Sequence, residues 1–151
     1  MHRINFLIIV IIILQITIGC KSDKKAFQEC VNFVEKQLSN KKIDFVVIIP
    51  NQGCAGCISY MEDFYIHNNE NPSIAFVFTN ITSLKILKMK IKINDSSTYL
   101  DINNRIMDYY PENKKLYPCI LELNDGKIKS VHYQSPQEDG LLFLIKKLNI
   151  L

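Results

Sequence analysis

Residues 43–69, IDFVVIIPNQGCAGCISYMEDFYIHNN, join an apolar run to a short polar loop with two cysteines and then to a second apolar pattern. The run Ile43–Ile49 is rich in branched side chains and is bounded by Pro50, which predicts a strand buried on both faces. From Ile58 onward, apolar residues recur at helical spacing. The two cysteines are therefore expected where a strand turns into a helix.

The flanking segments continue this alternation of helix and strand. Residues 27–38 carry apolar side chains every three or four positions, which predicts a helix, and the apolar run 74–79 predicts a second interior strand. A short helix is expected at residues 84–87. Residues 89–117 contain alternating patches that fit strands or loops equally well.

The C-terminal part predicts a hairpin followed by a helix. Two strand patterns within residues 119–133 flank Asp125-Gly126, a pair that tolerates the positive φ of a tight turn. Ser135, Pro136 and Glu138 then fit the N-cap, first and third positions of a final helix. The whole order predicts an α/β fold with a central mixed sheet and helices on both faces.

Length and composition limit the classes of protein to consider. The chain has 151 residues, of which 48% are apolar, and a formal charge of +3. This fits one domain with a short appendage and excludes two large domains. The positive charges are scattered along the chain, so nucleic acid is not expected as a partner.

The N-terminus has the pattern of an export signal. Arg3 precedes the apolar residues 4–18, a stretch shorter than a spanning helix needs. Gly19-Cys20 resembles the lipobox of bacterial lipoproteins, in which cleavage before the cysteine leaves it acylated, although Thr17 stands where that family usually has leucine. An uncleaved anchor and an ordinary cleaved signal are the alternatives, and all three place the domain outside the cytoplasm.

The domain boundaries follow from this interpretation. Residues 1–19 are expected to be the signal peptide, residues 20–25 a tether and residues 26–151 the folded domain. Cys20 is the expected lipidation site.

The cysteine pair carries the chemistry expected of the chain. At a helix N-terminus the first cysteine, Cys54, lies near amide donors that stabilise a thiolate, and Cys57 lies one turn inside. One thiol can attack a disulfide and the other can resolve the product. The same spacing also occurs in zinc sites and structural disulfides.

The chain resembles the thioredoxin-like family in three places. They are the strand ending at Pro50, the Gly53-Cys54-Ala55-Gly56-Cys57 motif that opens a helix, and Tyr117-Pro118 entering the C-terminal hairpin. Within that family it looks most like the membrane-tethered branch of bacterial lipoproteins. The resemblance implies that Cys54 is the nucleophile and Cys57 the resolving thiol.

The resemblance also implies substrate-binding residues, and one position departs from the family pattern. Pro118 would be a cis proline against the disulfide, and Tyr117 would offer its backbone to a substrate. Ile48 stands where thioredoxins usually have a buried acid, so proton transfer at Cys57 must use water or another group.

The remaining potential ligands are sparse. Zinc needs two further ligands beside the pair, and only His67 and His132 remain as imidazoles after the signal segment. His67 is at the far end of the predicted helix, roughly 15 Å away at the rise of an α-helix, so no metal is expected. Cys119 is expected to be a buried core residue, in preference to a third redox thiol. The same interpretation applies to Cys30, and a bridge between these two cysteines remains open.

These observations predict a lipid-anchored, periplasm-facing thiol-disulfide oxidoreductase of the cell envelope with no organic cofactor. Its expected partners are cysteine-containing envelope proteins and a membrane or periplasmic thiol protein that donates or accepts electrons. The first alternative is a non-catalytic lipoprotein that binds copper or a peptide through the same dithiol, with Cys119 as a third ligand. The second is a structural lipoprotein with an incidental disulfide.

Overall fold

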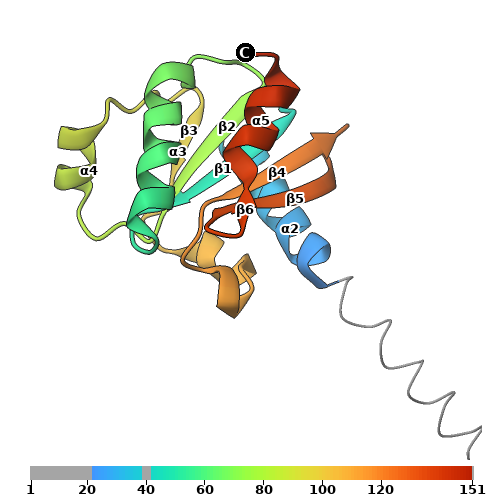
Figure 1. Cartoon of the computed structure of the whole chain (residues 1–151), viewed down its shortest axis with the longest axis horizontal. Coiled ribbons are helices and arrows are strands. Elements are labelled where there is room, and N and C mark those ends of the chain that lie inside the picture. Colours follow the sequence, from blue (N-terminus) through green and yellow to red (C-terminus); the bar gives the residue numbers. More distant parts are fainter. Residues whose placement is uncertain (1–21, 39–41, 151) are drawn as a thin grey trace, which may run out of the picture.

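A mixed six-stranded sheet with helices on both faces forms the body of the protein (Figure 1). The computed structural model describes residues 22–38 and 42–150. The strand order is β3-β2-β1-β4-β5-β6. In chain order the elements are α2 (Ser22–Gln37), β1 (Phe45–Pro50), α3 (Ala55–Asn68), β2 (Ile74–Thr79), α4 (Leu84–Lys90), β3 (Thr98–Leu100), the 3-10 helices η1 (Arg105–Tyr109) and η2 (Glu112–Lys114), β4 (Cys119–Asn124), β5 (Lys127–Ser135), β6 (Glu138–Asp139) and α5 (Gly140–Leu148).

Strand β1 lies in the centre of the sheet and confirms the prediction of a strand buried on both faces. All six of its residues are buried. It pairs in parallel with β2 and antiparallel with β4, so both of its edges are used. Polar side chains are costly on a strand with no exposed face or edge, which is why its sequence lacks polar alternation.

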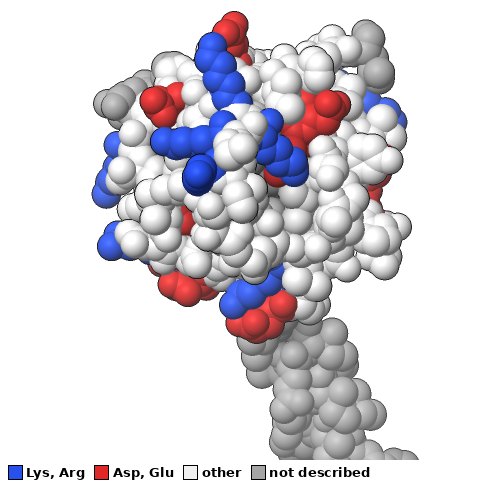
Figure 2. All heavy atoms as spheres, turned by 90° about the vertical axis from the view of Figure 1, so that its left-hand side faces the viewer, with Lys and Arg blue, Asp and Glu red and all other residues white. Residues whose placement is uncertain are grey.

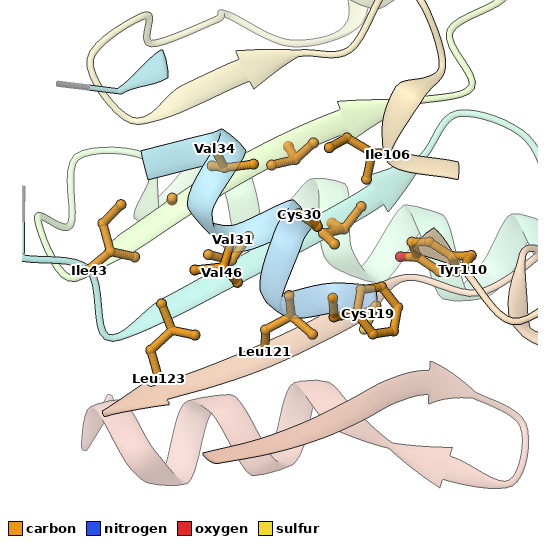
Figure 3. Close-up of a cluster of buried hydrophobic side chains, with 14 of the residues drawn as sticks. Cys30, Val31, Val34, Ile43, Val46, Ile106, Tyr110, Cys119, Leu121 and Leu123 are labelled. Atoms are coloured by element: carbon orange, nitrogen blue, oxygen red, sulfur yellow. The ribbon is translucent and has the colours of Figure 1, made fainter. Parts of the chain in front are cut away.

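Alternate residues of β1 enter two separate hydrophobic clusters. Val46 and Ile48 pack in the cluster under α2, whereas Val47 and Ile49 pack in the cluster under α3 and α5. Figure 3 shows the α2 cluster, with Cys30 from the helix and Cys119 from β4 among its apolar side chains. The sheet therefore separates the side chains of α2 from those of α3 and α5.

The segment without a firm prediction contributes one strand and two 3-10 helices. Residues 98–100 form β3, which extends the parallel part of the sheet beside β2. Asp101 follows this strand and is fully buried. Its carboxylate accepts hydrogen bonds from the Thr79 hydroxyl at 2.7 Å and from the backbone amides of Arg105 and Ile106 at 3.0 and 2.8 Å. One buried acid thus fixes the turn into η1.

The C-terminal hairpin is confirmed, but the predicted start of the last helix is wrong. Asp125 and Gly126 both have positive φ between β4 and β5. The helix begins at Gly140, and its cap is the carboxylate of Asp139. Ser135 ends β5 instead, and its hydroxyl accepts the amides of Gln137 and Glu138 within a tight turn. A serine that bonds amides two and three residues ahead serves a turn as well as a helix start.

The expected signal segment and Cys20 lie outside the described residues. None of the helices in residues 22–38 and 42–150 is both long and apolar enough to cross a bilayer.

Glu122 on β4 is a nearly buried carboxylate held by two lysines. Its oxygens accept hydrogen bonds from Lys129 at 2.9 Å and from Ser130 at 2.7 Å, and Lys147 of α5 lies 3.0 Å away. Burial alone would raise the pKa of Glu122, but these donors outweigh it and lower the pKa to about 2. The contacts join α5 to the hairpin.

We expect Glu122→Gln to lower the free energy of unfolding at neutral pH. The folded state holds the Glu122 proton less tightly than the unfolded chain, so this stabilisation is complete above about pH 4.5 and declines as the pH falls toward about 2. Urea unfolding across this range should show the two proteins converging in acid. Glu112→Gln, which removes an exposed ion pair with Lys115, is the control and should change little. A difference that stayed constant down to pH 2 would contradict this account.

Candidate active site

A disulfide joins Cys54 and Cys57 at the junction of β1 and α3, where the sequence predicts a strand-to-helix turn. The two Cα atoms are 5.3 Å apart. Cys54 is half-buried and Cys57 is only 7% exposed, while the intervening Ala55 and Gly56 are exposed. The two sulfurs are therefore unequal, because a partner in solution reaches Cys54 before Cys57.

The N-terminus of α3 is placed to stabilise a negative charge on the Cys54 sulfur. Cys54 is the N-cap residue, and its side chain makes no capping hydrogen bond. The first turn of the helix contains no acidic residue that would offset the positive end of the helix dipole. A thiolate on Cys54 would thus meet amide donors and a favourable dipole.

The backbone of Leu116 lies directly against the loop that carries the cysteines. The Cys54 amide donates a hydrogen bond to the Leu116 carbonyl oxygen at 2.9 Å. Gly53 has a φ of +149°, and a Cβ on this residue would lie 2.8 Å from the Leu116 carbonyl carbon. Only glycine allows this approach, because a side chain would collide with backbone that cannot move aside.

A second contact holds the loop from the other side. The Asn51 amide donates to the Thr79 carbonyl at 2.8 Å, which continues the β1–β2 pairing beyond Pro50. The Asn51 side-chain oxygen accepts a hydrogen bond from the Thr82 hydroxyl at 3.2 Å. The loop is thus fixed between two segments that lie far from it in the sequence.

The predicted substrate-binding residues lie in the segment that reaches the disulfide loop, but the direct contact comes from Leu116. Tyr117 is half-buried against the α2 cluster. Its backbone amide donates a hydrogen bond to the Lys114 carbonyl oxygen at 3.0 Å. Pro118 is buried, and its carbonyl accepts the Gln134 amide at 2.9 Å. The sequence could not predict the contact at Leu116, because the backbone carbonyl makes it and any residue type supplies one.

The cis bond that the resemblance implies before Pro118 is not found, and the bond is trans, as the sequence without the resemblance would predict. The described part of the chain contains no cis peptide bond. The trans form is the lower-energy isomer of a bond before proline, and the fold accommodates it here.

The two other described cysteines are core residues. Cys30 and Cys119 are fully buried thiols in the α2 cluster and belong to no disulfide, so no bridge joins them. Burial, together with the nearby charge of Asp101, raises the pKa of Cys30 to about 12. Cys119 packs on the α2 side of the sheet, while Cys57 belongs to a helix on the other side. Cys119 is therefore not placed to act as a third thiol or ligand at the disulfide.

The histidines lie in different settings. The ring of His67 contacts the Asp63 carbonyl at 2.8 Å, near the end of α3. His132 stacks on Phe143 with ring centroids 3.7 Å apart. No group of three or more histidine, cysteine or acidic residues in the described ranges is arranged to hold a metal ion.

Comparison of the chain with protein-family models, with curated proteins and with solved structures finds no match.

The two glycines of the motif should respond in opposite ways to the same substitution. Gly53→Ala places a methyl group against the Leu116 backbone at a positive φ, and we expect it to lower the free energy of unfolding by about 1–3 kcal/mol. At Gly56 a Cβ would meet nothing within 4 Å, so Gly56→Ala should raise stability by about 0.5–1 kcal/mol through its higher helix propensity.

Urea unfolding of the oxidised proteins measures both effects. Gly56→Ala is the matched control, since it adds the same methyl group three residues away. Equal effects of the two substitutions would show that the Leu116 contact does not constrain the loop.

Proposed function

We propose that this protein is a thiol-disulfide oxidoreductase with a thioredoxin-like fold, acting on cysteine-containing proteins of the cell envelope. The observation that carries the proposal is the unequal exposure of two bonded cysteines at a helix N-terminus. Cys54 is half-buried at the end of the helix, and Cys57 is buried one turn inside. An exposed attacking thiol with a protected resolving thiol is the arrangement that disulfide exchange requires.

The topology supports the fold assignment. The unit β1-α3-β2 has parallel strands, and the antiparallel hairpin β4-β5 followed by α5 completes the sheet on the other side of β1. This is the order implied by the resemblance to the thioredoxin-like family. The parallel strand β3 extends the sheet beyond β2, and α2 covers the opposite face.

Reduction of a substrate proceeds in two exchanges. The Cys54 thiolate attacks one sulfur of a substrate disulfide, whose S–S bond breaks and releases the other sulfur as a thiolate. Cys57 then loses its proton and attacks the Cys54 sulfur, which breaks the mixed disulfide and releases the second substrate thiolate. Two electrons pass to the substrate, and the Cys54–Cys57 bond forms. Substrate oxidation is the same sequence in reverse.

Solvent is the proton acceptor for Cys57 in this scheme. Ile48, at the position where the family has an acid, is buried on the α2 side of the sheet. Glu62 is buried on α3 itself; one of its carboxylate oxygens pairs with Lys90 of α4, and the other makes no hydrogen bond within the described part of the chain. The carboxylate of Asp101 is occupied by three donors. The scheme therefore takes water at the exposed Ala55-Gly56 side as the route for the proton.

The partners follow from the chemistry and from the expected leader. A thiol protein must reduce or reoxidise Cys54–Cys57 after each cycle, since two cysteines hold only two electrons. A lipid anchor at Cys20 would keep the domain at the membrane, facing the periplasm.

The alternatives have less support. Copper binding needs a third soft ligand, and Cys119 lies on the other side of the sheet from α3. A purely structural role for the disulfide is also disfavoured, because a crosslink between cysteines only three positions apart removes little entropy from the unfolded chain. A protein that only binds a peptide would show no turnover in a disulfide-exchange assay, which distinguishes it from the proposed enzyme.

Three variants test the proposal in a disulfide-reduction assay with a supplied reductant. We expect Cys54→Ser to reduce the rate to that of the reductant alone. Cys57→Ser should stop after the first exchange and accumulate a mixed disulfide through Cys54, visible as a mass increase that a reductant removes. Cys119→Ala, on the other side of the sheet, is the control and should keep the activity.

Full activity of Cys54→Ser would disprove the mechanism. Stoichiometric Cu(I) binding that is lost in Cys119→Ala, without exchange activity in the native protein, would favour the copper-binding alternative.

A further inference from the structure

The ring of His132 is held by contacts from three elements of the C-terminal part. Many lysines and acids of the domain project into solvent, as on the face shown in Figure 2. The half-buried ring of His132 lies instead among β5, which carries it, β6 and α5. Its Nε2 is 3.0 Å from the Ser130 hydroxyl, and its Nδ1 is 3.2 Å from a carboxylate oxygen of Glu138. One face of the ring stacks on Phe143, with centroids 3.7 Å apart.

The serine decides that Nε2 carries a proton. The Ser130 hydroxyl donates to the Glu122 carboxylate at 2.7 Å. Although burial opposes it, the donors around Glu122 lower its pKa to about 2, so this carboxylate is ionised and only accepts hydrogen bonds. With its single proton used, the Ser130 oxygen can only accept from His132. In a serine hydrolase the serine donates to the imidazole instead, so the arrangement is not that of a catalytic triad.

The Glu138 contact requires a second proton on the same ring. A carboxylate oxygen 3.2 Å from Nδ1 is attracted by an N–H and repelled by a nitrogen lone pair. With both ring nitrogens acting as donors, His132 is an imidazolium in this arrangement. The aromatic face of Phe143 also attracts a cation.

The other charged groups around the ring leave the contact with β6 as the deciding one. Two lysines lie nearby, Lys129 of β5 and Lys147 of α5, and the second is 5.6 Å from the centre of the Phe143 ring. Both pair with Glu122, at 2.9 and 3.0 Å, so that acid offsets part of their charge. Glu138 is the acid in direct contact with the imidazole, and it offsets the rest.

We propose that His132 is a pH-sensitive clamp on the end of the C-terminal hairpin. Its imidazolium form holds Glu138, and with it β6, against β5 and α5. Its neutral form keeps the bond to Ser130 and releases Glu138, because the lone pair left on Nδ1 faces a carboxylate. The change falls between about pH 5 and 8, where histidine changes its charge. The clamp does not depend on thiol exchange.

The clamp lies where the last helix begins. β6 pairs with the end of β5, and Asp139 of β6 caps α5 by accepting the Leu142 amide at 3.0 Å. The Gln134 side chain accepts the Leu141 amide at 2.8 Å. Release of Glu138 therefore weakens the turn that fixes the start of α5. Because the contacts to the imidazolium exist only in the folded protein, their stabilisation is complete in acid and is lost as the pH rises.

The tautomer of the neutral ring is the most direct test. NMR spectra of the histidine ring nitrogens of the full chain, recorded from about pH 5.5 to about pH 8, report which nitrogen carries a proton. We expect both nitrogens of His132 to be protonated in acid and Nε2 alone at the upper end. His67 is the internal contrast, because its Nδ1 lies 2.8 Å from the Asp63 carbonyl and should keep its proton. A neutral His132 with its proton on Nδ1 would overturn the proposal.

A double-mutant cycle measures the strength of the clamp. The full chain, His132→Gln, Glu138→Gln and the double variant are unfolded with urea in the oxidised state at both ends of this pH range. In acid we expect Glu138→Gln to raise the unfolding equilibrium constant about five-fold, and to have little effect when His132 is already replaced. This is the upper end for an exposed ion pair, because the ring is half-buried and stacked. At about pH 8 Glu138→Gln should have little effect in either background.

Asp63→Asn and His67→Gln form the matched control cycle. This pair lies on α3 with its charged atoms 3.9 Å apart and both side chains exposed, so its coupling should stay below about two-fold at both pH values. An equal effect of Glu138→Gln in acid and at about pH 8 would show a contact that does not sense the proton. No effect at either pH would show that the contact holds nothing, and both results would overturn the proposal.

Discussion

The complete burial of β1 is the constraint on which the rest of the structure depends. This strand has neighbours on both edges and packed side chains on both faces, so its end is fixed relative to every layer of the domain. The chain must leave the sheet immediately after Pro50 and turn into α3 within four residues. The disulfide therefore lies at the end of a strand that is packed on all sides, with Cys54 half-buried and Cys57 buried.

The contact between this junction and Leu116 joins two segments more than sixty residues apart in the sequence. It uses the Cys54 amide, so the orientation of the first cysteine depends on the loop before β4. Gly53 makes the contact possible, and Asn51 holds the other side of the turn. If the two thiols exchange bonds with a partner as we propose, such a fixed frame would favour the reaction, because it holds the attacking and resolving groups in place.

The sequence was informative where a residue pattern has a local cause. The run from Phe45 to Pro50 predicts its strand because burial on two faces disfavours polar residues, and Asp125-Gly126 predicts its turn because both residues accept positive φ. Ser135 led to a wrong prediction of the start of the last helix, because a serine that accepts hydrogen bonds from nearby amides occurs both in tight turns and at helix caps. Leu116 and Asp101 could not be predicted, since their parts depend on partners brought from distant strands. The proline isomer likewise depends on the folded loop and not on the residues beside it.

The central claim is that Cys54 is the accessible, activated thiol and that Cys57 is shielded behind it. Competitive alkylation of the reduced full chain near neutral pH, with each cysteine resolved by peptide mass spectrometry, tests it directly. The account predicts that Cys54 is modified at least ten-fold faster than Cys57, and that Cys30 and Cys119 react only on unfolding. Alkylation of Cys57 as fast as Cys54, or earlier reaction of either buried thiol, would contradict it.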